Sequence, residues 1–523
     1  MNILFRPDSE KNVKPLFPAA IKDLALSEIV EHICSIKEEK DIVMKIMTRI
    51  PQDLKDTEYR KEILSDLLEN AKLCEELSEC IGGIFVLKNY GGNYRSLRKQ
   101  ETTLYSLLED LRELQVYAKV TESLAECLSS HELRSEGLKQ LRDEQNKIVS
   151  SPDFKVLKND LEAIIKDLSV VRGCLVGVNF TPDLNIQEVA AIEFVPYHFR
   201  PKYSLAEKLT TLTLITPESL GFRKAHVLAA DPLLAQMAPK LEKHLKHNYS
   251  DLKKIFMKYA EFDSGSITDS YEALTFYLAM ARFGRSLRSS GYSFCFPEIS
   301  CGGSFSVKDF YNLRLAITDE KDIVENDFDF TSGERIFILT GPNRGGKTIL
   351  EQGLGLVSLM ASLGLFVPCS SCKGTPFKNI LTHFPIDENL TINYGRLGEE
   401  AVRVKSIVNE ADETTLILFN ETYSTTSSTD GLYLSKDLLR ILKERGSYVI
   451  FNTHIHDLAR NTEEMDSWDG ESKVISMVME RKDGKNTFKI RRDAPDTSSY
   501  ARVIAEKYGI TYEQMSKGGS SSK

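Results

Sequence analysis

The sequence of 523 residues lacks the features that define several classes of protein. No apolar run approaches the roughly 18 residues that a membrane-spanning helix needs, which argues against a membrane protein. Residues 1–15 contain no apolar core of the kind found in signal peptides, so we expect no secretion through one. The nine cysteines are scattered and odd in number, which is typical of reduced thiols in the cytoplasm. Cys369 and Cys372 form a Cys-x-x-Cys without a second pair, which predicts ordinary thiols rather than a zinc site.

The chain also has no excess of positive charge. It has 67 Lys and Arg against 76 Asp and Glu, and the net charge of −9 gives no global attraction to nucleic acid or to an anionic membrane. The net charge does not exclude a local basic face on the surface. Hydrophobic residues make up 41% and charged residues 27%, which excludes a mainly disordered, collagen-like or disulfide-scaffold chain.

The first 165 residues have the pattern of packed helices. Within them, a helical stripe is formed by Leu104, Leu107, Leu108, Leu111 and Leu114, with charges between them. The pairs Gly82-Gly83 and Gly91-Gly92 predict loops in this region, because glycine interrupts regular structure.

Two later changes of pattern indicate β structure. Residues 170–199 predict two short strands joined by a turn at Pro182-Asp183. From Phe294 onward, short apolar strands alternate with helices, which is typical of an α/β sheet. The clearest of these strands are Arg335–Thr340, Thr415–Phe419 and Ser447–Asn452.

The strongest motif is Gly-Pro-Asn-Arg-Gly-Gly-Lys-Thr at residues 341–348, which matches G-x-x-x-x-G-K-[ST]. A strand runs into it and a helix over 348–363 follows, the order that a phosphate-binding loop requires. Glycines let backbone N–H groups approach phosphate oxygens, and the helix N-terminus adds partial positive charge. We expect Lys347 to reach the terminal phosphates and the Thr348 hydroxyl to ligate magnesium. ATP and Mg²⁺ are thus the expected ligands, with the nucleotide bound by Gly341, Pro342, Asn343, Arg344, Gly345, Gly346, Lys347, Thr348 and Ile349.

Polar residues end the two later strands. Asn420 and Glu421 follow Thr415–Phe419, where such a site usually carries Asp-Glu. Glu421 stands where a general base or water-orienting group is expected. Asn420 can ligate the metal through its carbonyl oxygen but brings no negative charge. His454, at the end of the next strand, is the second catalytic candidate, although a histidine there can also be purely structural.

Several motifs together resemble the ATPase domain of the MutS family. They are GPNRGGKT at 341–348, NETYSTTSSTDG at 420–431, NTHIHDLA at 452–459, VEND at 324–327, and Ser499-Tyr500-Ala501 followed by 503–505. The resemblance is specific over residues 300–510 and weak over 1–300.

The resemblance implies a fold of class α + α/β. Residues 1–300 would form a helical core and lever domain, with a short β segment near 170–199 at the place of the family's DNA clamp. Residues 301–515 would form an ABC-type P-loop ATPase domain, and 516–523 a flexible tail. The segment 170–199 is short and not notably basic.

An ABC-type ATPase implies a head-to-tail pair in which ATP lies between one chain's phosphate loop and a signature helix of the other. The best candidate for this trans signature is Gly395 to Glu400, with Gly395 and Gly398 as its contact residues. The family's usual Ser-Thr before the helix is replaced here by Gly395-Arg396. The segment Thr425–Ser428 is expected at the same interface.

The expected function is that of a DNA-binding ATPase, a homodimer whose nucleotide state opens or closes lever arms around duplex or branched DNA. We expect no dedicated mismatch-reading domain, because residues 1–30 show no Phe-x-Glu wedge. Two alternatives stay open. In the first, Asn420 allows ATP binding but not efficient hydrolysis, and the protein is an ATP-gated switch. In the second, the protein is an active ATPase that acts on a protein or RNA partner.

Overall fold

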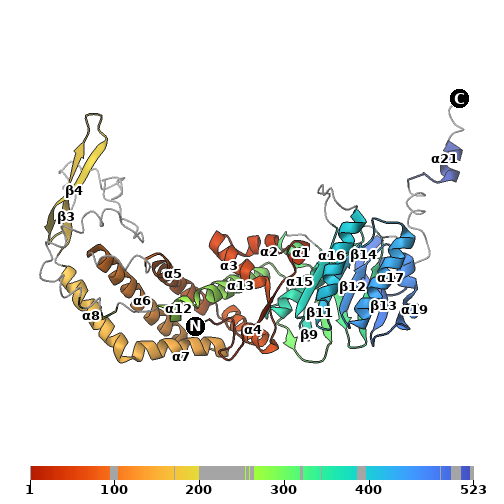
Figure 1. Ribbon diagram of the computed structural model, residues 1–523, viewed down its shortest axis with the longest axis horizontal. Coiled ribbons are helices and arrows are strands. Elements are labelled where there is room, and N and C mark those ends of the chain that lie inside the picture. The colour runs from red at the N-terminus through yellow and green to blue at the C-terminus, as the bar shows by residue number, and fades with distance from the viewer. Residues whose placement is uncertain are drawn as a thin grey trace. The chain divides into compact units, whose positions relative to one another are not determined.

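The computed structural model describes residues 2–94, 104–169, 171–198, 254, 258–259, 264–318, 322–342, 344–385, 396–482, 485–495 and 508–518. The chain divides into two compact units. The first comprises Met1–Asn2, Ala71–Arg134 and Leu138–Leu274, and the second comprises Ile3–Asn70, Ser135–Gly137 and Thr275–Lys523. This division differs from the sequence-based boundary at residue 300, because residues 3–70 pack with the C-terminal part of the chain. Figure 1 labels many of the elements of both units.

The first unit is mainly helical. Its elements are α5 (Ala71–Tyr94), α6 (Leu104–Ser130), most of α7 (Glu136–Ser150), α8 (Pro152–Leu168), α12 (Gly265–Thr268) and the start of α13 (Tyr271–Ser289). Helix α6 packs against both α5 and α8. Leu107, Leu111 and Leu114 are buried, as their helical spacing predicts.

The loops predicted at Gly82-Gly83 and Gly91-Gly92 are wrong, because α5 runs through both pairs. A Cβ atom on Gly83 would lie only 2.3 Å from Cγ2 of Val120 in α6. Glycine at this position therefore allows two helices to approach closely, and the packing outweighs its poor helix propensity.

The strands predicted near 170–199 are confirmed. Strands β3 (Gly173–Phe180) and β4 (Ile186–Val195) pair antiparallel and form a two-stranded hairpin. The turn between them includes Pro182-Asp183 and is closed by a backbone hydrogen bond from Thr181 to Asn185.

The second unit begins with a small strand pair and four helices. Their bounds are β1 (Val13–Pro15), α1 (Pro18–Asp23), α2 (Leu26–Ile33), α3 (Lys37–Met47), β2 (Arg49–Pro51) and α4 (Leu54–Glu69). Helix α1 packs on the edge strand β10 (Asn379–His383) of the unit's main sheet.

The main sheet has six strands in the order β10-β11-β12-β8-β13-β14. The other five are β11 (Thr415–Asn420), β12 (Tyr448–Asn452), β8 (Glu334–Thr340), β13 (Lys473–Lys482) and β14 (Lys485–Arg492). The strands from β10 to β13 are parallel, and β14 is antiparallel to β13. The three strands predicted from the sequence are confirmed as β8, β11 and β12, whose near-continuous apolar runs suit strands buried on both faces.

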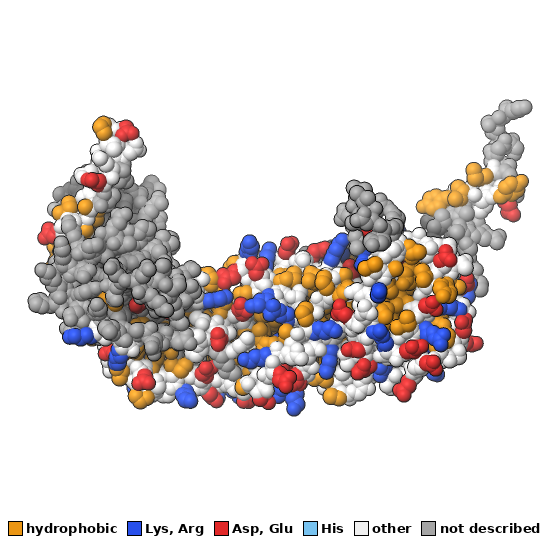
Figure 2. All heavy atoms as spheres, viewed as in Figure 1, with side chains coloured by type: hydrophobic (Ala, Val, Ile, Leu, Met, Phe, Trp, Pro, Cys, Tyr) orange, Lys and Arg blue, Asp and Glu red, His pale blue; other side chains and the backbone are white. Residues whose placement is uncertain are grey.

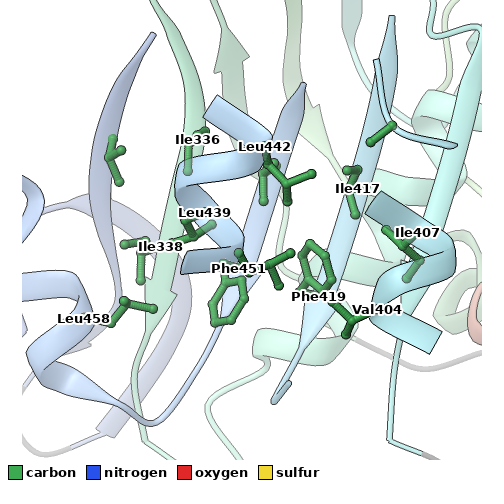
Figure 3. Packing of buried hydrophobic residues seen from close by; sticks show 14 of the residues in the cluster. Ile336, Ile338, Val404, Ile407, Ile417, Phe419, Leu439, Leu442, Phe451 and Leu458 are labelled. Carbon is green, nitrogen blue, oxygen red and sulfur yellow. The ribbon is translucent and has the colours of Figure 1, made fainter. Parts of the chain in front are cut away.

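Helices cover both faces of this sheet. Helix α15 (Lys347–Ser362) contacts β11 and β12. The core cluster of Figure 3 joins the sheet to helices α16 (Arg396–Glu410), α17 (Ser428–Glu444), α18 (His456–Arg460) and α19 (Thr462–Asp466). In it, Ile336 and Ile338 of β8 and Phe419 of β11 share a layer with Ile407 of α16 and Leu439 of α17.

A second sheet has the strand order β5-β9-β6-β7. Its strands are β5 (Glu298–Ile299), β9 (Ser371–Gly374), β6 (Phe305–Phe310) and β7 (Asn326–Phe330), and helix α14 (Leu313–Ile317) follows β6. Cys369 and Cys372 are buried free thiols at β9, and the Cys369 sulfur lies 3.5 Å from that of Cys295. Among the residues that the structure describes, no group of three or more His, Cys, Asp or Glu could hold a metal ion.

Within the described ranges, no helix combines the length and the apolar composition needed to cross a membrane. The last described element is α21 (Tyr512–Gly518), which extends into the segment 516–523 where the sequence predicts a tail.

Candidate functional site

Three neighbouring strands of the main sheet end at one edge. The loop at residues 341–346, here called the glycine loop, follows β8. Asn452 ends the adjacent strand β12, and Asn420 ends β11 beyond it. Because carboxyl ends of parallel strands meet at the same edge of a sheet, residues more than 70 positions apart in the sequence become neighbours.

The glycine loop leads directly into α15. Gly346 is the N-cap residue of this helix, with a φ of 90°. Gly341 has a φ of 153°, and a Cβ atom on Gly345 would lie 2.8 Å from the carbonyl oxygen of Pro342. Glycine is therefore favoured at these three positions of the loop, and the first N–H groups of α15 follow directly after it. Asn343 lies outside the described residues.

Lys347 is the first residue of α15, and its side chain folds back over the loop. Its Nζ donates hydrogen bonds to the carbonyl oxygens of Gly341 at 3.0 Å and of Pro342 at 3.3 Å. Burial lowers the pKa of the Lys347 ammonium, while the nearby carboxyl groups of Glu421 and Glu351 oppose this shift. The loop thus holds one buried cation.

Asn420 is the centre of a polar network. Its Oδ1 accepts a 2.6 Å hydrogen bond from Nδ2 of Asn452 and a 3.3 Å hydrogen bond from the hydroxyl of Thr348. Residues 420 and 452 are also direct partners in the register of β11 and β12. The structure therefore brings together the two side chains predicted to ligate a metal, Thr348 and Asn420. It also shows that Asn452, which the sequence analysis did not single out, orients the Asn420 amide.

Glu421 and His454 are likewise brought together. The Nε2 of His454 lies 2.9 Å from Oε1 of Glu421, and both side chains are about one-third exposed. The hydrogen bond and charge of His454, together with the charge of Lys347, hold the pKa of Glu421 below its usual value. Glu421 is therefore a carboxylate that can accept hydrogen bonds at the open side of the site.

A second group that the sequence analysis missed is Glu351, one turn after Lys347. Its carboxyl is fully buried, and Asn452 lies close to it. Burial raises its pKa well above the usual value, so the uncharged acid is favoured. An acidic residue at the fifth position of a buried apolar helix was the available signal in the sequence.

A cavity of about 370 Å³ lies beside the glycine loop. Its lining is mostly apolar and comes from three places in the chain: residues 310–315 with 322–326, the start of α15, and β14. The lining includes Ile323, Gly346, Ile349 and Phe488. Ile349, predicted as a nucleotide contact, thus faces this cavity.

The trans signature candidates lie elsewhere. Gly398 is in the first turn of α16, which packs against the edge strand β10. Two strands separate β10 from β8, so these two strands lie about 14 Å apart in the sheet. Gly395 lies outside the described residues. Ser427 caps α17, and the hydroxyl of Thr425 donates to Glu400 of α16.

Comparison with known proteins finds one matching family model, MutS domain V, over residues 337–517. The chain is 29% identical over 186 residues to "Endonuclease MutS2" of Clostridium novyi, a match that covers 35% of this chain and 23% of that protein. It is 26% identical over 310 residues to "DNA mismatch repair protein MutS" of Shouchella clausii, covering 58% and 33%. It is 24% identical over 502 residues to the protein of the same name from Pelotomaculum thermopropionicum, covering 89% and 55%.

The matches span between about a quarter and about half of the length of these relatives. The domain V match includes the glycine loop, β11 and β12, the elements that form the site. Residues 337–517 thus match MutS domain V, and the chain as a whole is similar to proteins named MutS and MutS2.

Proposed function

We propose that the glycine loop and the ends of β11 and β12 form the site of a magnesium-dependent ATPase, as the sequence motifs predict. The observation that carries this proposal is the hydrogen-bonded convergence of Thr348, Asn420 and Asn452 beside the Lys347 ammonium. These groups come from the start of α15 and the ends of β11 and β12, and a polar cluster of this kind beside a glycine loop suits a phosphate ligand.

The residues present fit ATP and Mg²⁺. Glycine positions without room for a Cβ allow the backbone to approach phosphate oxygens, and the N-terminus of α15 and Lys347 supply positive charge. The Thr348 hydroxyl and the Asn420 carbonyl are neutral oxygen donors, the ligand type that magnesium accepts alongside phosphate. When bound, Mg²⁺ would neutralise phosphate charge.

The cavity beside the loop suits the base of the nucleotide. It opens next to Gly346 and Ile349 at the start of α15, and its apolar lining includes Phe488. Adenine buries a flat apolar face readily, and an aromatic side chain can stack on it. We therefore assign the phosphates to the glycine loop and the base to this cavity.

In this proposal, Glu421 orients the attacking water. Its carboxylate is at the open side of the site, with one oxygen bonded to His454 and the second free to accept from water. His454 holds the side chain of Glu421 in place and can report the state of the terminal phosphate through this contact. Phosphoryl transfer depends mainly on such positioning and on charge stabilisation.

A hydrolysis-deficient switch is the second candidate, and Asn420 is the observation that favours it. Its amide oxygen points at Thr348, but it carries no negative charge to hold a metal. ATP would then bind with little turnover, and nucleotide binding alone would gate the partner.

The assembly we propose is a homodimer with ATP at the interface. Gly398 lies on α16, which packs against β10 and not against β8, the strand that leads into the glycine loop of the same chain. It is therefore suited to complete the site of a second chain. ATP would then tighten the dimer, because a ligand favours the state that binds it better. Sedimentation with and without a slowly hydrolysed ATP analogue tests this, and a monomer under both conditions would contradict it.

DNA, duplex or branched, is the partner that we propose first, since the relatives named above include DNA mismatch repair proteins. The hairpin of β3 and β4 favours the alternative of a protein partner. Residues 173–197 contain no Lys or Arg, and exposed Leu175, Phe180 and Ile192 lie on the strands. Figure 2 shows hydrophobic and acidic side chains on the visible face of this hairpin. Phosphate contacts need cations, which this hairpin lacks.

One experiment separates these functions. Phosphate release from ATP is measured on the full chain at increasing concentrations of plain, branched and mismatched duplex DNA, at two salt concentrations. Turnover that rises with DNA and falls with salt supports a DNA-dependent ATPase. A rate of phosphate release that does not change with DNA concentration supports a protein or RNA partner. ATP binding without phosphate release supports the switch.

A further inference from the structure

The loop after β11, residues 421–425, has an unfavourable backbone. Glu421 has a φ of 54° and Tyr423 a φ of 62°, in the left-handed region that a side chain makes costly. Such a conformation persists only where the surrounding structure imposes it, and it is concentrated at functional sites. The contacts that hold this loop therefore determine where the Glu421 carboxylate lies.

The first part of the loop is fixed from the sheet. The N–H of Glu421 donates to the carbonyl oxygen of Asn452 at 2.8 Å. The hydroxyl of Thr422 lies 2.8 Å from Nδ1 of His383, a buried residue at the end of β10. Both anchors come from strands adjacent to β11, so they follow directly from the sheet order.

The second part of the loop is fixed from a helix. The N–H of Tyr423 donates to Oε1 of Glu400 at 2.8 Å, and the hydroxyl of Thr425 donates to Oε2 of the same carboxylate at 3.3 Å. The Tyr423 side chain is 6% exposed and packs in the core cluster of the sheet. Glu400 thus satisfies a backbone N–H at a strained residue, two positions after the catalytic carboxylate.

We propose that Glu400 is a positioning residue for ATP hydrolysis, whose carboxylate holds the loop at Tyr423 and Thr425 and thereby keeps Glu421 in place. The inference rests on the proposed ATPase function and goes beyond it. Glu400 acts through its contacts with the loop of its own chain, one to a backbone N–H and one to a side-chain hydroxyl. Because Gly398 lies two residues earlier on α16, a displacement of the start of this helix reaches Glu421 by the same contact.

The test compares three variants of the full chain: Glu400→Ala, Glu400→Gln and Glu410→Ala. Glutamine keeps an acceptor oxygen for the Tyr423 N–H, and Glu410 is an exposed glutamate at the other end of α16. We expect Glu400→Ala to lower kcat about tenfold or more, with the affinity for a non-hydrolysed ATP analogue unchanged within about twofold. Glu400→Gln is expected to retain most of kcat, and Glu410→Ala all of it.

Amide hydrogen exchange supplies a readout that does not require turnover. Glu400→Ala should speed exchange in the peptide that contains Tyr423, while Glu410→Ala leaves it unchanged. An unchanged kcat in Glu400→Ala, an equal loss in Glu400→Gln, or a parallel loss of analogue affinity would each overturn the positioning role. If the wild type releases no phosphate, the proposed hydrolysis fails instead, and exchange alone decides whether Glu400 holds the loop.

Discussion

Replacing Asn420 with aspartate distinguishes the proposed ATPase from the hydrolysis-deficient switch. The two side chains have nearly the same shape, and the oxygen that accepts from Asn452 and Thr348 is present in both. Residue 420 is 5% exposed, so the substitution adds one negative charge in a buried place and changes little else.

The added charge should lower the stability of the protein without a metal and raise it when a metal is bound. In the nucleotide-free protein, the new carboxylate is next to Glu421 and is only partly compensated by the Lys347 ammonium. We expect the free energy of unfolding to fall by at least about 1–3 kcal/mol, the range for an unsatisfied neutral polar group, because a buried charge costs more. Magnesium and ATP should reverse this loss, because opposite charges about 4 Å apart attract by about 1 kcal/mol even at the dielectric constant of water, and Mg²⁺ carries two.

If that attraction of about 2 kcal/mol is expressed in the transition state, kcat rises about 30-fold. Steady-state phosphate release, with analogue binding measured in parallel, provides the assay. The matched control is Asn452→Asp, which adds the same charge one strand away but replaces the Nδ2 donor to Asn420 with an acceptor. This control should lose turnover. The reasoning is refuted if both aspartate variants behave alike, or if Asn420→Asp leaves kcat unchanged while the wild type is active. If neither the wild type nor Asn420→Asp hydrolyses ATP, the switch is supported.

Three further predictions follow from particular contacts. Lys347→Met should remove the thermal stabilisation by MgATP, which is about 2.7 kcal/mol at a ligand concentration of 100 Kd. It should not lower the melting temperature of the nucleotide-free protein, because burial already disfavours the charged form of Lys347. Glu421→Gln should abolish most phosphate release and leave analogue affinity nearly unchanged, because the carboxylate acts on water and not on the nucleotide; an equal loss of affinity would show that it is misassigned. Gly83→Ala should destabilise the protein by about 1–3 kcal/mol in urea unfolding, because its Cβ would overlap Val120, whereas Gly82→Ala, with nothing within 4 Å, should be neutral or stabilising.

Much of the sheet could be predicted from the sequence because its signals are local. Strands such as Arg335–Thr340 and Thr415–Phe419 are continuous apolar runs that end in polar residues, and no other part of the chain is needed to recognise them. The glycines of α5 could not be interpreted in this way. Gly83 is in a helix because Val120, 37 residues later, packs against it, and a local pattern carries no information about that contact.

The same distinction applies to the candidate site. The loop motif and its helix are contiguous, so their juxtaposition was predictable. Asn452 was not singled out as a partner of Asn420, because this pairing requires the strand order β11-β12 and its register. Both asparagines end apolar strands, and this shared position was the sequence feature that could have indicated their pairing. The Glu400 contact and the apolar cavity involve elements separated by more than 20 residues, and nothing local indicates them.

The charges of the site explain why binding and hydrolysis can respond to different residues. Asn420 and Asn452 are neutral amides, and burial favours the uncharged acid of Glu351, so Lys347 is the buried cation among the described residues at the glycine loop. A neutral amide network beside a cation suits an anionic nucleotide. The carboxylate of Glu421 lies instead at the open side, on a loop with strained backbone. Nucleotide affinity should therefore depend on the glycine loop, whereas the rate of hydrolysis should depend on how that loop after β11 is held.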